Sequence, residues 1–262
     1  MMKKYISIDI FGDLGTFKKS DGNAIMFTSY NMIPYTVVLG ILGAILGLEG
    51  YKKKEDFPEF YNILKGLNIG IKPLSKNGNG IFQKGRVEYT NTSGFANTEG
   101  RGKRKYGTVL IIKEQFLIHP SYRIYIELDK MNTNHKRLYD LLKNGESTFN
   151  IYLGKNEFFA TYDNFREYKV NAIEDKSDIR ISSIFSADRL KPNFKKEYVF
   201  SLSSSEETNY ILFERIPVGF DENTGNYILE KFCYTNMKLS LKRSEGLFLF
   251  ESSNIKEVVF LF

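Results

Sequence analysis

Basic and aromatic side chains alternate in one glycine-rich stretch, residues 72–107. Lysine and arginine attract phosphates, and aromatic rings stack on bases with about 1–3 kcal/mol per base. The stretch therefore has the composition of a single-stranded nucleic-acid binding segment, although a flexible loop with ordinary aromatic anchors is the alternative. It contains the basic residues Lys72, Lys76, Lys84, Arg86, Arg101, Lys103, Arg104 and Lys105, the acidic residues Glu88 and Glu99, and the aromatic residues Phe82, Tyr89, Phe95 and Tyr106.

This stretch accounts for the whole net charge of the chain. The 262 residues include 37 Lys and Arg against 31 Asp and Glu, which is a net charge of +6. Eight of the basic and two of the acidic residues lie within 72–107, so the rest of the chain is neutral with 29 of each. A neutral body with one basic segment predicts a localised contact with a polyanion.

A second candidate phosphate site lies nearer the N-terminus. Lys18 and Lys19 follow the first predicted strand, and residues 28–31, Thr-Ser-Tyr-Asn, precede the first predicted helix. Ammonium groups, hydroxyls and the unpaired amides of a helix start can together hold phosphates. A solvated charged loop is the alternative interpretation.

A third group could do acid–base chemistry. His119, Lys113 and Tyr122 are residue types that cleave RNA through its 2′-hydroxyl group. No spacing rule links them, and a turn histidine before proline is more often structural. We therefore expect no catalytic residue in this chain.

Metal, disulfide and redox chemistry are disfavoured by the composition. Cys233 is the single cysteine and lies between Phe232 and Tyr234, so no disulfide can form within the chain, and we expect a buried, inert thiol. The two histidines, His119 and His135, cannot build a multi-histidine metal site unaided. We expect neither a metal nor a cofactor.

No segment indicates export or a membrane. The N-terminus passes directly into an alternating strand and lacks the long apolar core of a signal peptide. The most apolar stretch, 37–48, has twelve residues, whereas a membrane-spanning helix needs roughly 20. Together with the single cysteine, these features predict a cytoplasmic protein in a reducing compartment, with no membrane partner.

Strands and helices are predicted to alternate in the first 155 residues. Strand patterns occur at 5–10, 68–71, 109–116, 122–128 and 149–153. Helical patterns occur at 35–46, 57–67 and 132–143. We expect Asn31 to cap the first helix. No period is visible in 72–107, so we expect a long insertion without regular structure there.

The first predicted helix carries three glycines, Gly40, Gly43 and Gly47. Each glycine in a helix costs about 0.8–1 kcal/mol relative to alanine. We therefore expect these positions to allow close packing against a sheet or a partner, not to take part in chemistry.

The order of these elements predicts an α+β fold. Residues 1–155 match an RRM/ferredoxin-like βαββαβ domain with a long basic insertion at 72–107. Residues 156–262 predict a β-rich C-terminal region, with a hairpin turn at 221–226 and strand candidates at 197–203, 210–215, 227–234, 247–251 and 258–262. Because this architecture serves RNA-binding proteins and many others, the fold alone does not decide the function.

Five segments spread over the first 160 residues resemble one known family. They are 11–19 (FGDLGTFKK), 33–47 (IPYTVVLGILGAILG), 89–97 (YTNTSGFAN), 120–125 (PSYRIY) and 152–160 (YLGKNEFFA). In this order they resemble the Cas-five family of CRISPR-associated proteins, a family of the RAMP superfamily. The third and fourth segments are similar to its type I-B branch.

The resemblance implies an RNA-binding subunit of a type I CRISPR Cascade surveillance complex, which acts in antiviral defence. In that family the subunit has an RRM-like domain and caps one end of the complex. It holds the 5′ handle of the CRISPR RNA (crRNA) and contacts the backbone subunit and the large subunit, and it meets target DNA through the complex. A long insertion acts as a thumb over the guide, and 72–107 lies at the corresponding place.

Eight residues are thereby assigned to RNA binding. Near the RRM-like sheet, the handle is expected to contact Lys18, Lys19, Tyr30 and Arg123. On the thumb, phosphates are expected to be held by Arg101, Lys103, Arg104 and Lys105.

The resemblance also bears on catalysis. In the type I-C branch, the related subunit cuts precursor RNA with a Tyr, Lys and His set. Here Ile118 precedes His119, so the Lys-His pair of that set is absent. We therefore expect a non-catalytic subunit. A metal-independent endoribonuclease that processes CRISPR repeat RNA is the alternative, and a protein-only adaptor whose basic segment meets an acidic partner is a third possibility.

Overall fold

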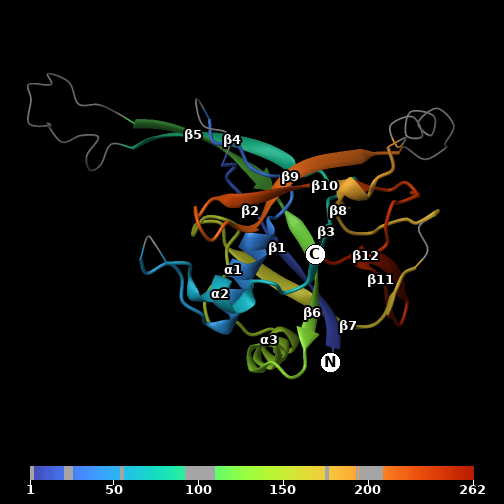
Figure 1. The fold of residues 1–262 in the computed structure, drawn as a ribbon. Helices are drawn as coiled ribbons and strands as arrows, with labels where there is room; N and C mark the ends of the chain where they lie inside the picture. The colour runs from blue at the N-terminus through green and yellow to red at the C-terminus, as the bar shows by residue number, and fades with distance from the viewer. Residues whose placement is uncertain are drawn as a thin grey trace, which may run out of the picture.

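The largest element of the fold is a six-stranded antiparallel sheet in the order β12-β11-β7-β1-β6-β3 (Figure 1). The computed structural model describes residues 3–20, 26–53, 56–91, 110–174, 177–192, 194 and 209–262. Within them the chain is a mixed α/β protein with many strands and few helices. The sheet comprises β1 (Lys3–Gly12), β3 (Ile69–Pro73), β6 (Ser121–Asp129), β7 (Ala160–Ala172), β11 (Leu247–Ser252) and β12 (Ile255–Phe260).

Helices α1 (Tyr35–Leu46) and α3 (Thr133–Asn144) pack on one face of this sheet. Ile6, Ile8 and Ile10 of β1 point to that face and are fully buried, as the alternation in the predicted strand requires. They join one core cluster with Leu39 of α1 and Leu138 of α3. The strand predicted at 5–10 and the helices predicted at 35–46 and 132–143 are confirmed.

The two long helices begin differently. The Asn132 side chain accepts hydrogen bonds from the amides of Asn134 and His135 at 2.9 and 3.2 Å, which caps α3. Helix α1 begins after Pro34 and has no side-chain cap. The prediction that Asn31 caps α1 is therefore wrong, because tertiary contacts described below occupy its side chain.

The glycines of α1 allow close packing against the short helix α2 (Glu59–Leu64). A Cβ atom at Gly43 would lie 2.3 Å from Cβ of Phe60, whereas one at Gly40 would lie 3.8 Å from the same ring. Gly47 has a φ of 78°, in the left-handed region that glycine favours at a helix end. Close packing against a helix is therefore confirmed at Gly43, whereas Gly47 packs closely on Thr148 and Gly40 has room for a Cβ atom.

The six-stranded sheet curls until its two ends meet. Ile69 of β3 and Phe262 exchange two backbone hydrogen bonds of 3.1 and 2.9 Å. A second buried cluster, away from the helices, consists of Tyr125, Tyr168, Phe250, Val259 and Leu261. The face opposite the helices is therefore covered by the protein's own strands.

Two three-stranded sheets flank the large one. One has the order β8-β10-β9, with β8 (Phe185–Ser186), β9 (Ile211–Phe220) and β10 (Tyr227–Thr235), and a 3₁₀ turn, η2 (Ala187–Arg189), follows β8. The other has the order β2-β5-β4, with β2 (Leu14–Gly15), β4 (Gln83–Asn91) and β5 (Leu110–Ile118). The turn predicted at 221–226 is confirmed between β9 and β10.

Three predictions about regular structure need correction or stay open. Residues 83–91 were expected to lack regular structure but form β4, whose two exposed faces produce no simple apolar alternation. Residues 149–153, all of them described, form no strand, and the neighbouring strand is β7 at 160–172. The strand predicted at 197–203 lies outside the described residues.

The large sheet crosses the predicted domain division at residue 155. Its strand β7 pairs with β1 on one side and with β11 on the other. Residues after 155 therefore share a sheet with residues before it. The two-part division itself stays a prediction.

Composition predicted a buried, inert Cys233, no metal site and no membrane segment. Cys233 is buried, and its burial raises the pKa of the thiol to about 12. The described residues hold no group of three or more His, Cys, Asp or Glu placed to bind a metal ion. In the part of the chain that the structure describes, no helix is long and apolar enough to cross a membrane.

Candidate nucleic-acid interface

The segment that precedes α1, residues 26–34, is held between the base of the β4–β5 hairpin and the chain after β2. The Phe27 amide donates to the Lys113 carbonyl at 2.9 Å, and the Gln115 amide donates to the Phe27 carbonyl at 2.8 Å. On the other side, the Lys19 amide donates to the Thr28 carbonyl at 2.9 Å. The two segments that were predicted to share a phosphate site are thus paired through their backbones.

Ser29 fixes the crossing point of these segments. Its hydroxyl accepts the Phe17 amide at 2.9 Å and donates to the Tyr30 carbonyl at 2.8 Å. Its own amide donates to the side-chain oxygen of Gln115 at 3.3 Å. The Ser29 hydroxyl is buried and serves the loop, so it is not presented to a ligand.

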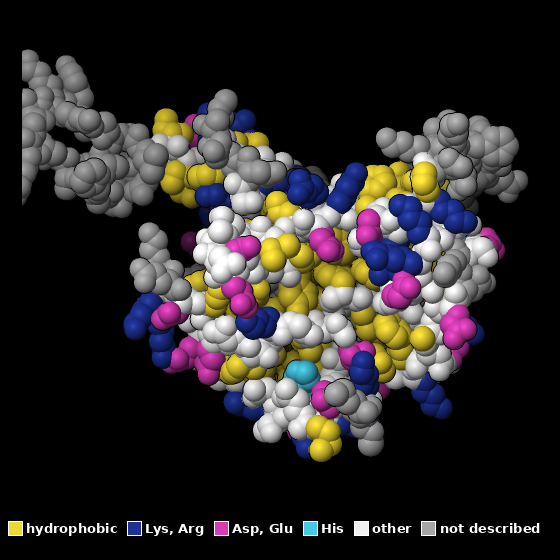
Figure 2. Space-filling view, viewed as in Figure 1, with side chains coloured by type: hydrophobic (Ala, Val, Ile, Leu, Met, Phe, Trp, Pro, Cys, Tyr) yellow, Lys and Arg dark blue, Asp and Glu magenta, His cyan; other side chains and the backbone are white. Residues whose placement is uncertain are grey.

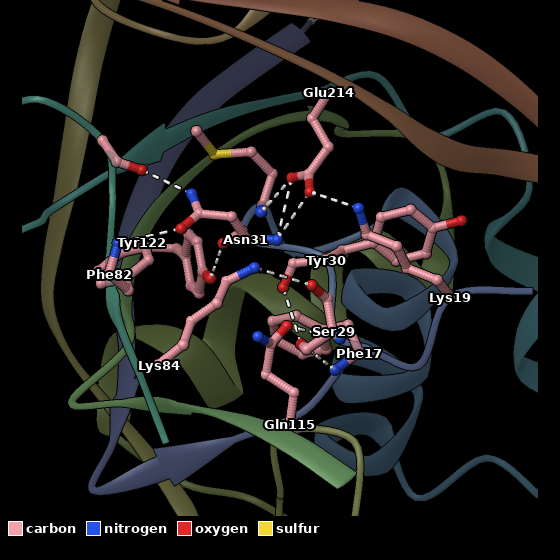
Figure 3. A network of polar contacts seen from close by, with 12 residues as sticks. Phe17, Lys19, Ser29, Tyr30, Asn31, Phe82, Lys84, Gln115, Tyr122 and Glu214 are labelled. Atoms are coloured by element: carbon pink, nitrogen blue, oxygen red, sulfur yellow. Dashed lines mark hydrogen bonds and ion pairs between the residues drawn. The ribbon is translucent and has the colours of Figure 1, made fainter. Parts of the chain in front are cut away.

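Asn31 is the centre of a polar network that joins three parts of the chain (Figure 3). Its side-chain amide donates to the Gly80 carbonyl at 2.6 Å, and its side-chain oxygen accepts the Phe82 amide at 3.0 Å. Its carbonyl accepts the buried hydroxyl of Tyr122 at 2.5 Å. These bonds tie the start of α1 to the base of the hairpin.

Glu214 of β9 completes this network from the other small sheet. Its carboxylate accepts the Asn31 amide at 3.0 Å through both oxygens and the Met32 amide at 2.8 Å. Its Oε1 lies 3.5 Å from Nζ of Lys19 (Figure 3). The Glu214 side chain is only 9% exposed, so these groups are its immediate environment.

Three lysines surround this loop. Nζ of Lys18 lies 3.3 Å from the centre of the Phe27 ring, and Nζ of Lys84 donates to the Ser29 carbonyl at 3.1 Å. Lys19 lies over Tyr30 at 5.2 Å as well as beside Glu214. Burial lowers the pKa of Lys84, Glu214 opposes the lowering, and Lys19 adds to it. Glu214 thus forms an ion pair with Lys19 and acts on Lys84 through its charge alone.

The hairpin extends this cationic surface. One face of the hairpin carries Lys84, Arg86 and Glu88, which alternate along β4, and Lys113, which pairs with Glu88 in register. Glu88 contacts Arg86 at 3.3 Å and Lys113 at 3.4 Å. In Figure 1 the hairpin reaches beyond the body, and in Figure 2 dark blue side chains gather over the region of β4, β5 and β9. The opposite face carries Tyr89, over which Lys155 lies at 5.5 Å.

The structure brings together three of the eight predicted contact residues. Lys18 and Lys19, in the chain after β2, lie beside Tyr30 in the segment before α1. The Tyr30 side chain is 3% exposed and packs in the core. Arg123 lies on β6, away from this loop, and forms two hydrogen bonds with Asp9. Its contact with RNA stays a prediction. The remaining four residues, Arg101, Lys103, Arg104 and Lys105, lie outside the described residues.

Sequence reasoning missed the roles of Asn31 and Glu214. Asn31 was expected to cap a helix and to lie at a phosphate site, and Glu214 was placed only in a predicted strand at 210–215. Asn31 and Glu214 are themselves 183 positions apart, and the lysine partner of Glu214 lies still farther away in the sequence. No local signal in the sequence reveals such contacts. Lys84 was identified only as one cation among eight.

The possible acid–base group is dispersed. His119 is 76% exposed and lies 3.6 Å from Asp13, whereas the Tyr122 hydroxyl is buried against Asn31. Nζ of Lys113 lies 3.4 Å from Glu88 on the hairpin. Each of the three side chains therefore has a separate partner.

The residues of this interface lie in a part of the chain that matches the model of a protein family. The family model described as CRISPR-associated protein (Cas_Cas5) matches residues 5–222. The chain belongs to this Cas5 family. The matched region of this Cas5 chain includes the loop before α1, the hairpin and Glu214. The predicted family is confirmed, and the type I-B branch stays a prediction.

The solved structures that are similar to this chain include proteins of CRISPR systems. A chain of a CRISPR RNA-guided surveillance complex has 11% identity to this Cas5 chain and a TM-score of 0.50, with 91% of each chain covered. A CRISPR protein from Archaeoglobus fulgidus has 15% identity and a TM-score of 0.48, with 98% of each chain covered. A chain of the Type III-B Cmr-beta complex bound to cognate target RNA and AMPPnP has 14% identity and a TM-score of 0.43, with 90% of this chain and 85% of that chain covered. No curated protein matches the chain.

Proposed function

We propose that this chain is a non-catalytic RNA-binding subunit of a type I CRISPR Cascade complex of the I-B branch. It holds the 5′ handle of the crRNA and contacts the backbone and large subunits, and it meets target DNA through the complex. The observation that carries the proposal is the Cas5 family match over residues 5–222.

The order of the strands supports an RRM-like domain within this fold. Strands β7, β1, β6 and β3 are neighbours in that order, with α1 and α2 between β1 and β3 in the chain, and α3 between β6 and β7. A βαββαβ unit has its strands and helices in this order, which supports the proposed RRM-like domain. The β4–β5 hairpin is inserted between β3 and β6, where a thumb is expected.

The RNA path proposed here runs along the cationic face of the hairpin to the loop before α1. Phosphates meet Lys18, Lys19 and Lys84 at the loop, and Arg86 and Lys113 along the hairpin. The basic residues 101–105 continue the same segment in the sequence. Phosphate contacts position the strand without reading its sequence, so bases are recognised elsewhere.

Co-expression with the neighbouring subunits tests the proposal. The complex is expected to co-purify with RNA that has one defined 5′ end, because the handle is held at a fixed place. Complexes without RNA, or with RNA of random 5′ ends, contradict the proposed function.

Binding by the isolated chain tests the surface. A single-stranded RNA of mixed sequence and about ten nucleotides is a suitable probe, since such sites span roughly 4–16 nucleotides. The variant Lys18→Ala/Lys84→Ala is expected to bind more weakly, and the slope of log K against log salt is expected to flatten by about 0.7 per lysine. Replacing residues 101, 103, 104 and 105 by alanine is expected to have the same kind of effect.

A control pair lies on the other side of the molecule. Lys136 and Lys143 of α3 are exposed, and Figure 1 shows α3 far from the hairpin. The variant Lys136→Ala/Lys143→Ala is expected to keep the affinity and the salt slope. Equal losses in both double variants would mean that binding follows total charge and not this surface.

The non-catalytic part of the proposal has its own test. Repeat RNA incubated with the purified chain in EDTA is expected to stay intact. Cleavage that disappears in His119→Ala would instead establish the endoribonuclease alternative.

A further inference from the structure

Glu214 is a carboxylate placed within the proposed phosphate-binding surface. Its oxygens contact the amides of Asn31 and Met32 and the ammonium of Lys19. Successive backbone amides in a loop, together with a lysine, are groups that protein sites use to bind an anion such as phosphate. Glu214 therefore occupies a place whose donors suit an external anion.

The contacts of Glu214 differ in strength. The amide contacts are 2.8–3.0 Å long and lie in the interior. The contact with Lys19 is longer, at 3.5 Å, and the Lys19 side chain is 30% exposed. Because the contact is long and the Lys19 ammonium is partly exposed to water, Lys19 can leave Glu214 at small cost while the amides keep the carboxylate in place.

We propose that Glu214 is an internal competitor of RNA: a phosphate of the bound strand takes Lys19 from Glu214, whereas the amides of Asn31 and Met32 stay on the carboxylate. The inference rests on the proposed RNA-binding function and adds a residue that tunes it. Glu214 then has two separable roles, since it positions the loop through the amides and weakens RNA binding through Lys19.

Two substitutions separate these roles. Glu214→Gln keeps a carbonyl oxygen for the amides and removes the negative charge that holds Lys19. Glu214→Ala removes both the acceptor and the charge. Thermal unfolding of the full chain measures the positioning role, and binding of the mixed-sequence RNA measures the competition.

Glu214→Gln is expected to bind RNA about two- to fivefold more tightly, which is the range for releasing one partly exposed ion pair. Its salt slope is expected to equal that of the wild type, because Lys19 reaches the phosphate in both proteins. Compared with Glu214→Gln, the variant Glu214→Ala is expected to unfold at a lower temperature and to bind RNA less tightly. The reason is that the amides of Asn31 and Met32 lose their acceptor.

The variant Lys19→Ala tests whether the effect of Glu214→Gln depends on Lys19. In this variant the salt slope is expected to flatten by about 0.7, and adding Glu214→Gln is expected to change the affinity no further. A gain from Glu214→Gln that persists without Lys19 would reflect general charge repulsion and would overturn the competition. The same conclusion follows if Glu214→Gln binds no more tightly than the wild type.

Failure of RNA binding as such and failure of the competition give different experimental results. If the wild-type chain and its complex bind no RNA, the proposed function is overturned and the competition falls with it. If the wild type binds RNA with the expected salt slope but the Glu214 and Lys19 variants behave independently, only the competition is overturned.

Discussion

Arg123 and Asp9 are register partners on the adjacent strands β6 and β1, and the guanidinium binds the carboxylate through two hydrogen bonds of 2.7 and 2.9 Å. Both side chains are largely buried, with 11% and 7% exposure. The hydrogen bonds to Asp9 raise the pKa of Arg123 above its ordinary value. A residue predicted from sequence to contact RNA thus has a partner inside the sheet.

Arg123→Ala is expected to destabilise the chain by about 3–5 kcal/mol, because the buried Asp9 carboxylate loses its counter-charge. Asn164 then remains as a weaker partner at 3.2 Å. Urea unfolding measures the change. Arg86→Ala, on the exposed hairpin, is the control and is expected to stay within about 0.5 kcal/mol of the wild type. Similar losses in the two variants would show that the Arg123 pair does not stabilise the sheet.

Gly40 and Gly43 are expected to respond to alanine with opposite signs. At Gly43 the new Cβ would lie 2.3 Å from Cβ of Phe60, an atom next to the backbone, so α2 must shift, at about 1–3 kcal/mol. At Gly40 the nearest atoms are 3.8 Å away, so removing a helix glycine is expected to stabilise by up to about 1 kcal/mol. Calorimetric unfolding temperatures compare the two. Stabilisation by both substitutions would refute the close packing of α1 on α2.

Cys233 is expected to be unreactive in the native chain. With a pKa of about 12, a fraction of about 1 in 10,000 of its thiols is ionised at pH 8, whereas a free cysteine is about one quarter ionised. A thiol-disulfide reagent at pH 8 is therefore expected to label native protein about a thousand times more slowly than protein in 6 M guanidinium. Equal labelling rates would show that the residue is accessible.

His135 is expected to make stability depend on pH. Burial lowers its pKa below the model-peptide value of 6.5, Asp129 opposes the lowering, and the ring nitrogen Nδ1 accepts the Asp129 amide at 3.0 Å. A lowered folded-state pKa favours the neutral ring. The full stability is therefore present above pH 6.5 and is lost as the pH falls through the folded-state value.

The pH effect of His135 can be separated from that of other groups. The unfolding free energies of the wild type and His135→Ala are compared between pH 7.5 and 5.5, and their difference is expected to shrink as the pH falls. A constant difference for His135→Ala would contradict the prediction.

Local patterns in the sequence predicted most elements of the fold. The alternation of Ile6, Ile8 and Ile10 marks β1, and Asn132 and Gly145 mark the ends of α3. Because these signals depend only on residues that are close in the sequence, they can be recognised from the sequence alone. Strand β4 was not predicted because most of its residues are exposed on both faces of the hairpin, so its sequence does not need a buried apolar side.

By itself, the sequence determined the strand and helix pattern, the concentration of positive charge in 72–107 and the family resemblance. Only the tertiary structure decided which cations already have partners. It pairs Lys19 with Glu214 and Arg123 with Asp9, and the sequence separation of the second pair is 114 residues. An ion pair depends on where the fold brings two strands together, and neither composition nor local periodicity carries that information.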